Sequence, residues 1–551
     1  MLWRGDALVD VAPRALDVLI ALVERAGDVV TKEELLQRVW PDTFVEEANL
    51  SVNVSALRKA LGTGDGGHAY IQTIPRRGYR FVSGTADAAP PAAPRPAIAV
   101  LPFRDLAPVA GDEYLGVGTS VALISRLCRL SGIVVRPTSA ILKYVDAPVA
   151  PRDAIRELRV DAIVEGTVQR SGNRVRVTVQ LVRAGEDAAA WSDSFEAEMT
   201  GLFAVQDAAA EQVARALDVE LRGPDRAVLA RRDTADALAS QAYLKGRYFW
   251  SRFTGPWMAR AFACFQEAVE RDPSYALPHA GLADAYLVLG FSGMAPPSEA
   301  WPLAEESART ALRLDATLAD AHISLAWVRL FRDWDWEGAR ASLRRALDLS
   351  SGAAAHQWYG LFRAMEGRLD DARREIERAA ELEPLSIVTG ALRGLERNLE
   401  GDHAGELEQM RAIVDLDPNH FLGHWGLALA YEHAGRTEDS IASVRRAIVL
   451  AEDSAILTAV LARSEALAGR SGEARRLLAA MESGPGHPSE YQRAATALAL
   501  GEKEEALRRL EAAAIAREPW MVLVAVDPML TELRGDSRFE VLVRRVFAKH
   551  A

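Results

Sequence analysis

Residues 31–82 read TKEELLQRVWPDTFVEEANLSVNVSALRKALGTGDGGHAYIQTIPRRGYRFV, and this stretch decides how the amino-terminal part of the chain folds. It opens on Thr31, and Glu34 follows three residues later. A threonine hydroxyl here accepts from a free helix amide and the glutamate reaches back to the cap amide, so a helix is predicted. The helix should end near Val39, because the residue before Pro41 is pushed out of helical geometry.

A second helix is predicted from about Glu47 to Leu61. Its apolar residues recur at helical spacing and mark one buried face: Leu50, Val54, Leu57 and Leu61. The other faces carry side chains that can hydrogen-bond base edges and phosphates, namely Asn49, Ser51, Asn53, Ser55, Arg58 and Lys59. After a glycine-rich break, residues 70–74 and 79–82 alternate like two strands around a turn that contains Arg76 and Arg77. The pattern is therefore helix, turn, helix and a two-stranded wing.

Charge is distributed unevenly along this region. Residues 51–84 hold five basic residues and one acidic residue, whereas residues 1–50 hold five basic and ten acidic residues. A module polarised in this way can turn its basic side toward phosphates. The whole chain is acidic, with a net charge of −12, so any binding to duplex DNA must be local. A small α/β domain with a solvated helix is the alternative, in which Arg76 and Arg77 only keep the turn soluble.

Several separated motifs recur in order here: PRALDVL at 13–19, TKEELL at 31–36, VWPD at 39–42, SALRKAL at 55–61 and PRRGYRF at 75–81. Together they resemble the C-terminal DNA-binding domain of OmpR/PhoB-type transcriptional regulators, and more narrowly the ToxR/CadC-like branch, in which the module is amino-terminal. The resemblance implies a recognition helix at 47–61, a loop at 40–46 that often touches RNA polymerase, and a wing at 75–79 that probes the minor groove. The implied DNA-binding residues are Asn49, Ser51, Asn53, Ser55, Arg58, Lys59, Arg76, Arg77 and Tyr79.

The chain departs from this family pattern in two ways. Family members usually carry a small antiparallel sheet before the first helix. Ahead of Pro13, only residues 2–9 could form strand here, enough for about one strand. We therefore expect that the true start lies upstream, or that most of the sheet is lost. No receiver domain with a phosphorylatable aspartate accompanies the module, so control independent of a phosphorelay is expected from the rest of the chain.

The 551-residue composition limits the class of protein. Cys128 and Cys264 lie far apart, which fits a reduced compartment and offers neither a disulfide frame nor a metal cluster. No apolar run approaches the roughly 18 to 20 residues that a bilayer crossing needs. Residues 84–96 form an Ala/Pro spacer where many ToxR/CadC-like proteins have a membrane helix. We expect a soluble protein of the bacterial cytoplasm with no membrane partner.

Residues 97–222 are predicted to form an α/β domain. Strands are expected at 98–103 and 133–136, helices at 117–130, 152–158 and 202–217, and a hairpin where 161–169 meets 175–182. The motifs VLPF at 100–103, YLG at 114–116, EGTV at 165–168, VTVQLV at 177–182 and WSDSF at 191–195 resemble the TolB N-terminal-like domain. That family implies sensing or docking without catalysis. A phosphate-binding loop at 116–120 is the alternative to an ordinary helix entry, but it lacks the Gly-Lys-Ser/Thr ending.

The chain repeats itself beyond residue 234. Glycines expected at the ends of helices fall at 367, 401, 435, 469 and 501, spaced by 34, 34, 34 and 32 residues. Acid-proline pairs also recur, as at Asp417-Pro418. The period resembles the tetratricopeptide repeat, so 234–519 should stack about eight helix pairs into a superhelix with a concave groove. Residues 520–551 are expected to cap it.

The predicted groove is more apolar than charged. Counting along each repeat places these residues on it: Leu287, Trp327, Leu361, Leu395, Trp425 and Leu429. Such a lining suits a peptide helix, a partner subunit or another domain of this chain, and the alternative is that the residues simply pack.

Histidines in the repeats are expected to be structural. His279, His322, His356 and His424 should all be the fourth residue of a first helix. His420 and His424 are spaced like ligands, but His433 is their nearest third partner and should lie too far along the helix, so no metal is predicted.

The sequence thus predicts a multidomain, mainly α-helical protein: a winged helix, an α/β domain and a tetratricopeptide solenoid. It contains no Gly-x-Ser-x-Gly, His-Glu-x-x-His or Gly-Lys-Ser/Thr motif, so we expect neither an enzyme nor a cofactor. The predicted function is sequence-specific regulation of transcription, with a signal or partner bound by the second and third domains. A homodimer on DNA would place its half-sites about 10 to 11 base pairs apart. Alternatives are an interaction scaffold with a degenerate winged helix, or a subunit of a cyclase-type signalling enzyme.

Overall fold

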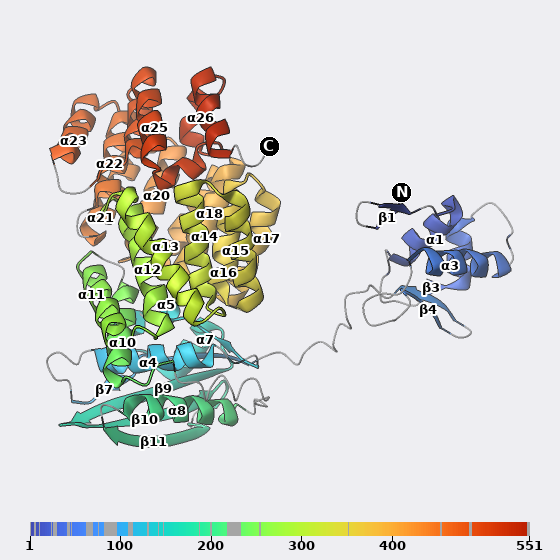
Figure 1. The fold of residues 1–551 in the computed structure, drawn as a ribbon, viewed down its shortest axis with the longest axis horizontal. Coiled ribbons are helices and arrows are strands. Elements are labelled where there is room, and N and C mark those ends of the chain that lie inside the picture. The colour runs from blue at the N-terminus through green and yellow to red at the C-terminus, as the bar shows by residue number, and fades with distance from the viewer. Residues whose placement is uncertain are drawn as a thin grey trace. The chain divides into compact units, whose positions relative to one another are not determined.

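The protein forms two compact units, Met1–Arg95 and Pro96–Ala551, which are described separately (Figure 1). The structure is a computed structural model. It describes residues 2–4, 7–9, 11–23, 25, 30–40, 45, 47–61, 70–74, 77–81, 96–107, 114–128, 130, 132–141, 143–146, 148–186, 188–198, 201–217, 233–252, 255–350, 352–451, 454–483 and 487–547.

The first unit begins with a β-hairpin. Strands β1 (Leu2–Arg4) and β2 (Ala7–Val9) pair antiparallel, with Leu2 opposite Val9 and Arg4 opposite Ala7. The prediction of about one strand was wrong, because two three-residue strands fit where only Gly5 and Asp6 separate them.

Three helices and a three-stranded sheet complete this unit. The helices are α1 (Pro13–Val23), α2 (Lys32–Val39) and α3 (Glu47–Leu61), and the strands β3 (Val30–Thr31), β4 (Ile71–Ile74) and β5 (Gly78–Phe81) lie in the order β3-β5-β4. The predicted capping box at Thr31 and Glu34 is present at the start of α2. The predicted apolar stripe of α3 supplies Leu50, Val54 and Leu57 to a core shared with α1 and α2. Helix α3 and the wing β4–β5 are thus fixed to one hydrophobic core.

A six-stranded sheet opens the second unit. The strands are β6 (Ala97–Val100), β7 (Arg104–Asp105), β8 (Val134–Val135), β9 (Ala162–Ser171), β10 (Arg174–Arg183) and β11 (Trp191–Glu198). Their order is β11-β10-β9-β6-β8, with β7 paired to β9. The predicted hairpin is β9–β10. The edge strand β11 was not predicted as an element; most of its side chains are exposed, so it lacks the alternation of a half-buried strand.

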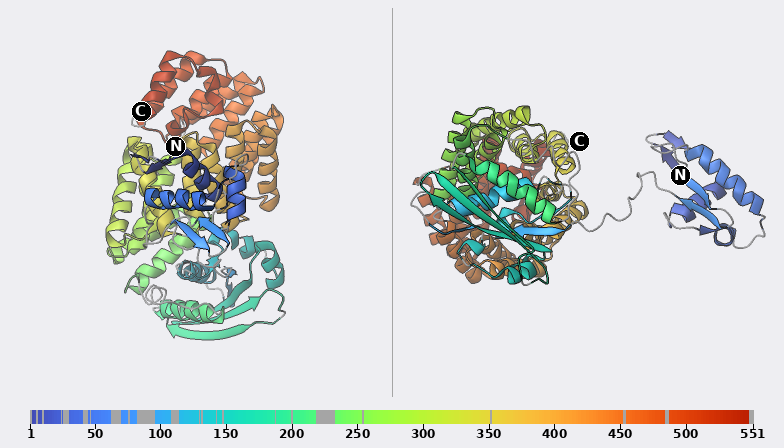
Figure 2. Two further views of the ribbon diagram at one scale, coloured as in Figure 1. Left: turned by 90° about the vertical axis from the view of Figure 1, so that its right-hand side faces the viewer. Right: turned by 90° about the horizontal axis from the view of Figure 1, so that it is seen from below.

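Helices α4 (Tyr114–Leu127) and α8 (Leu202–Ala216) pack on each other and on this sheet (Figures 1 and 2). Helix α7 (Pro151–Leu158) matches its prediction, while the short helices α5 (Thr138–Ile141) and α6 (Lys143–Asp146) were not predicted. Helix α4 begins before residues 116–120, so the considered phosphate loop lies inside a helix. Its Ser120 hydroxyl donates to the Leu101 carbonyl and accepts from the Phe103 amide, both at 2.9 Å. These contacts support an ordinary structural role for the segment.

The solenoid contains eight consecutive helix pairs within the described residues. The pairs are α10 (Ala237–Arg252) with α11 (Gly255–Arg271), α12 (Ala276–Phe291) with α13 (Pro297–Leu314), α14 (Ala319–Val328) with α15 (Trp336–Leu349), α16 (Ala353–Met365) with α17 (Leu369–Leu382), α18 (Ile387–Glu400) with α19 (His403–Leu416), α20 (Phe421–His433) with α21 (Thr437–Ala451), α22 (Ala455–Leu467) with α23 (Ser471–Ser483), and α24 (Glu490–Ala499) with α25 (Lys503–Ala516). The predicted number of about eight units is confirmed.

Local details of the repeat also match the prediction. The periodic glycines that include Gly401 and Gly435 have positive φ angles, as expected where a helix ends in the left-handed conformation. His279, His322, His356 and His424 are each the fourth residue of a first helix. Three of these rings hydrogen-bond a carbonyl six residues upstream, as His424 does with Pro418 at 2.9 Å. These three histidines therefore tie each first helix to the loop before it.

The carboxy-terminal segment does more than cap the last repeat. It comprises the 3-10 helices η3 (Pro519–Leu523) and η4 (Pro528–Leu533) and helix α26 (Ser537–Phe547). Trp336 of α15 donates from Nε1 to the Val546 carbonyl at 3.0 Å and stacks on Phe547. Trp520 of η3 lies 4.7 Å from Phe291 and 6.2 Å from Trp425, measured between ring centroids. The end of the chain therefore packs against both early and late repeats.

The α/β domain and the solenoid form one unit because their interface is extensive. Helix α10 packs on α4, which separates it from the sheet in Figure 1. Arg136 follows β8 and donates to the carbonyls of Leu158 and Arg159 in its own domain and to Leu382 of the solenoid. None of the helices in the described ranges is both long and apolar enough to span a lipid bilayer.

Candidate nucleic-acid interface

The exposed side of α3 is the first candidate surface. Its core-facing residues Leu50 and Leu57 are fully buried, and this fixes which side of the helix faces outward. The predicted residues Asn49, Ser51, Ser55 and Lys59 are exposed, and Asn53 is half-buried with its amide bonded to the Asn49 carbonyl at 2.8 Å. The structure thus presents amide, hydroxyl and ammonium groups on one helix, the groups that reach base edges and phosphates.

Arg58 was predicted to contact DNA, and the structure shows its guanidinium group bonded to the wing. Its Nε donates to the Ile71 carbonyl at 2.9 Å, and its Nη2 donates to Thr73 Oγ1 at 2.8 Å. Both acceptors belong to the wing strand β4. The guanidinium group therefore joins α3 to the wing, and the sequence could not show this because the partners are 13 and 15 residues away.

Tyr79 was also predicted to contact DNA, and its burial contradicts a direct contact. Its ring belongs to the hydrophobic core and is only 5% exposed. Its hydroxyl lies 3.3 Å from Ser51 Oγ, so it forms a second link between the wing and α3. The physical reason is strand position: Tyr79 lies on the middle strand of the sheet β3-β5-β4, paired with Val30 and Thr73, and its ring faces the core.

The tip of the wing carries the remaining predicted residues. Arg77 is exposed in the turn between β4 and β5, and its amide donates to the Ile74 carbonyl at 3.1 Å. Arg76 lies outside the described residues, as do Pro41–Phe44 and Glu46 in the loop predicted to touch polymerase. Among the described residues, the wing therefore offers Arg77 as the cation at its tip.

Val52 is a candidate that the sequence prediction missed. It is 65% exposed on α3, away from the buried stripe. An exposed valine outside the buried stripe of α3 adds little to the core, but it can contact the methyl group of thymine. The signal was present in the sequence, since Val52 does not fit the spacing of Leu50, Val54 and Leu57.

The predicted partner groove of the solenoid is largely filled by the chain itself. Leu287 and Trp327 are buried in one cluster with residues of the carboxy-terminal segment, including Met521 and Val522, so they are not open to a partner here. Leu361, Leu395, Trp425 and Leu429 are half-buried. Prediction from the repeat pattern placed these residues correctly on helices but had no means of showing what covers them.

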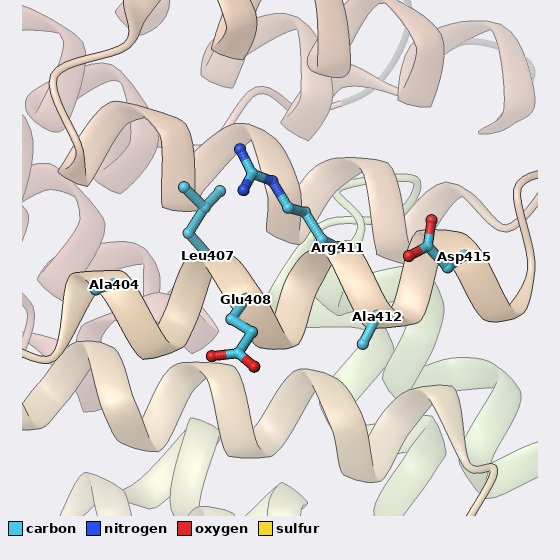
Figure 3. A pocket seen from close by; sticks show the side chains of 6 residues that line it. All are labelled: Ala404, Leu407, Glu408, Arg411, Ala412 and Asp415. Atoms are coloured by element: carbon cyan, nitrogen blue, oxygen red, sulfur yellow. The ribbon is translucent and has the colours of Figure 1, made fainter.

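A separate open hollow of about 470 Å³ runs along α19. It is lined by Ala404, Leu407, Glu408, Arg411, Ala412 and Asp415. Figure 3 shows the Glu408 carboxylate pointing away from the side chains of Arg411 and Asp415. The polar groups therefore do not converge on one ligand, and the hollow does not form a defined binding site.

Comparison with known proteins identifies both amino-terminal domains. Residues 6–81 match the family described as "Transcriptional regulatory protein, C terminal". Residues 95–211 match the "HilA/YgeH-like transcriptional regulator, second domain", a more specific description of the α/β domain than its resemblance to TolB.

Individual relatives agree with these matches. The transcriptional regulator HilA of Salmonella typhimurium is 26% identical over 395 residues, which cover 71% of this chain and 69% of HilA. The transcriptional activator CadC of Escherichia coli is 31% identical over 80 residues, 14% of this chain and 16% of CadC. A putative adenylate cyclase 3 of Rhizobium meliloti is 27% identical over 250 residues, 44% of this chain and 42% of that protein. By these matches, residues 6–81 belong to an OmpR/PhoB-type winged-helix domain and residues 95–211 to a HilA-like second domain, a combination that supports a DNA-binding transcriptional regulator.

Proposed function

We propose that the outer face of α3 and the wing together read a specific duplex sequence, and that the second unit binds the signal or partner that controls this reading. The observation that carries the proposal is the double link between helix and wing. Arg58 bonds two wing residues and Tyr79 reaches back to Ser51, so helix and wing form one preorganised surface. Preorganisation lowers the entropic cost of binding.

Each exposed group has a role that its chemistry allows. Asn49, Ser51 and Ser55 can hydrogen-bond base edges in the major groove, and Val52 can contact a thymine methyl group. Lys59 and Arg77 supply positive charge for phosphates or for the narrow minor groove beside the wing. Because its target is chromosomal DNA, we place the protein in the bacterial cytoplasm. A homodimer on DNA and a contact with RNA polymerase through residues 40–46 remain part of the proposal.

The inner surface of the solenoid is the proposed partner site. Trp327, Trp425 and Trp520 have buried indole N–H groups without a hydrogen-bond partner in the described part of the chain. Backbone carbonyls of a bound peptide would satisfy such donors. The segment 519–533 would then share this surface with the peptide or give way to it.

Hydrogen exchange tests whether the segment can be displaced. Amides of 519–533 should exchange faster than those of α22, and equal protection would argue against displacement.

A genome-wide experiment tests the proposed function most broadly. The full chain, bound to fragmented genomic DNA, recovered and sequenced, should enrich a small set of promoter fragments that share a common site. Enrichment no greater than that of a Lys59→Glu, Arg77→Glu variant would instead support the scaffold alternative, in which the winged helix no longer binds DNA.

A further inference from the structure

Two histidines and a glutamate meet where α19 faces the end of α20. His403 is the first residue of α19, Glu406 lies about one turn later on the same side, and His433 is the last residue of α20. Nδ1 of His433 lies 3.0 Å and 3.1 Å from the two carboxylate oxygens of Glu406. Nδ1 of His403 lies 3.7 Å from one of them. One ligand atom from each residue fits within 4.8 Å of the others.

The carboxylate of Glu406 is buried in this cluster without a guanidinium or ammonium group beside it among the described residues. Glu406 is 3% exposed, and within the described residues its ion-pair partners are the two imidazole rings, with no arginine or lysine among them. A buried carboxylate is costly unless a positive charge is close to it. The two rings offer nitrogen atoms to the carboxylate. A bound cation would supply the missing positive charge.

An unused nitrogen points to a ligand as well. Nδ1 of His403 is buried and has no hydrogen-bond partner in the described part of the chain. A buried polar atom of this kind needs an explanation, such as a bound ion. Here the unpaired nitrogen lies beside a carboxylate and a second imidazole, whose ring stacks on that of His403 at 5.4 Å between centroids.

We propose that His403, Glu406 and His433 bind one divalent transition-metal ion, such as Zn²⁺, with the remaining position open to water. Imidazole nitrogen and carboxylate oxygen are ligands that Zn²⁺ binds at about 2.0 to 2.2 Å, and two histidines with one glutamate form an open three-ligand set. Imidazole also suits Ni²⁺ and Cu²⁺. Around a tetrahedral ion the ligand atoms lie about 3.4 Å apart, so the His403 ring would move by about 1 Å. That ring is partly exposed at a helix start, where such a movement is easy.

The ion would satisfy every group in the cluster. It would neutralise Glu406, occupy the unpaired nitrogen of His403, and bind Nδ1 of His433 while that ring keeps its proton on Nε2. It would also join neighbouring repeats, because His403 and Glu406 belong to α19 and His433 belongs to α20.

The sequence prediction missed this group because its members are far apart in the chain. It weighed His433 only against His420 and His424, whereas the structure pairs His433 with residues 27 and 30 positions upstream. His424 bonds the Pro418 carbonyl instead. It therefore offers a matched control: a histidine of the same repeat helix outside the cluster.

Titration of the full chain tests the site. Protein treated with a chelator and dialysed would be titrated with Zn²⁺ in a calorimeter and with Co²⁺ in a spectrophotometer, since four-coordinate Co²⁺ absorbs strongly in the visible range. We expect one ion per chain at this site. His403→Ala, Glu406→Gln and His433→Ala should each weaken binding at least tenfold, because even second-shell changes cost about 10- to 100-fold. His424→Ala should bind like the unmodified protein.

Two results would overturn the proposal: no heat and no visible absorption in the unmodified protein, or equal affinity in the unmodified, His403→Ala and His433→Ala proteins. Circular dichroism of each variant separates loss of a ligand from loss of folding. If Glu406→Gln proves unstable, His403→Ala carries the test, because His403 is partly exposed at the start of its helix.

Discussion

The two surfaces that the sequence assigned to partners are built in opposite ways. Helix α3 turns polar side chains outward, and its hydrogen bonds to the wing hold that face in place. The inner surface of the solenoid is apolar, and the carboxy-terminal segment packs over much of it. Polar groups that hydrogen-bond bases and phosphates can stay exposed to water, whereas the apolar residues of the solenoid are buried together with residues of the carboxy-terminal segment.

The largest expected effect concerns the covering of the solenoid. Trp336→Ala removes a fully buried indole that bonds the Val546 carbonyl and stacks on Phe547. We expect the free energy of unfolding of the second unit to fall by about 3 to 5 kcal/mol, as for other buried tryptophans. Denaturant unfolding followed by far-ultraviolet circular dichroism measures it. Val541→Ala, on the exposed side of α26, is the control and should change little.

A change of similar size should appear with pH, again in the second unit. Burial raises the pKa of Glu383 to about 7, against the opposing effect of Arg136. A carboxyl group whose pKa is raised in the folded state holds its proton more tightly in that state than in the unfolded chain. The contribution of Glu383 to the free energy of unfolding is therefore fully present below pH 4.5 and is lost as pH rises through about 7. Glu383→Gln should remove up to about 3 kcal/mol of pH dependence. An unchanged stability profile between pH 4.5 and 7.5 would refute the assignment.

Arg58→Ala tests whether the DNA-binding surface is held by its own hydrogen bonds. Loss of the bonds to Ile71 and Thr73 should lower the stability of the first unit by about 2 kcal/mol, given two bonds from a charged donor that is partly exposed. DNA affinity should fall with it, and Arg58→Lys should not restore either property because ammonium lacks the fork geometry. Weakened DNA binding with an unchanged melting curve would instead return Arg58 to the contact residues.

A smaller effect is expected for Val52→Ala. Loss of two methyl groups from an exposed contact should weaken specific binding by about 1 kcal/mol, roughly fivefold, without affecting stability. Competition binding measures the affinity for pairs of operators. In each pair, one thymine near α3 is replaced by uracil, which lacks the methyl group. If Val52 contacts a thymine methyl group, one uracil substitution should weaken the unmodified protein but not the variant. A variant that loses affinity equally for both operators would contradict this role.

A feature could be predicted from the sequence when the residues that determine it lie close together in the chain. The Thr31 cap, the stripe of Leu50, Val54 and Leu57, and the positive-φ glycines such as Gly435 depend on neighbours within a few residues, and all were confirmed. Trp336 meets Val546 across 210 positions, and no local pattern signals that contact. The same reason applies to the candidate site: the pattern placed Arg58 on α3 and Tyr79 on the wing, but their hydrogen bonds join residues 13 and 28 positions apart, which no local pattern signals.

The salt dependence of DNA binding tests the central claim most directly, that the exposed face of α3 and the wing bind the duplex. Each phosphate contact contributes about 0.9 to the slope of log affinity against log salt concentration. We predict a steep negative slope for the full chain on an enriched genomic fragment, and a slope shallower by about 1 for Lys59→Ala. Arg174→Ala, which removes an exposed side chain of β10 in the second unit, should leave the slope unchanged. Equal slopes for all three proteins would contradict the account.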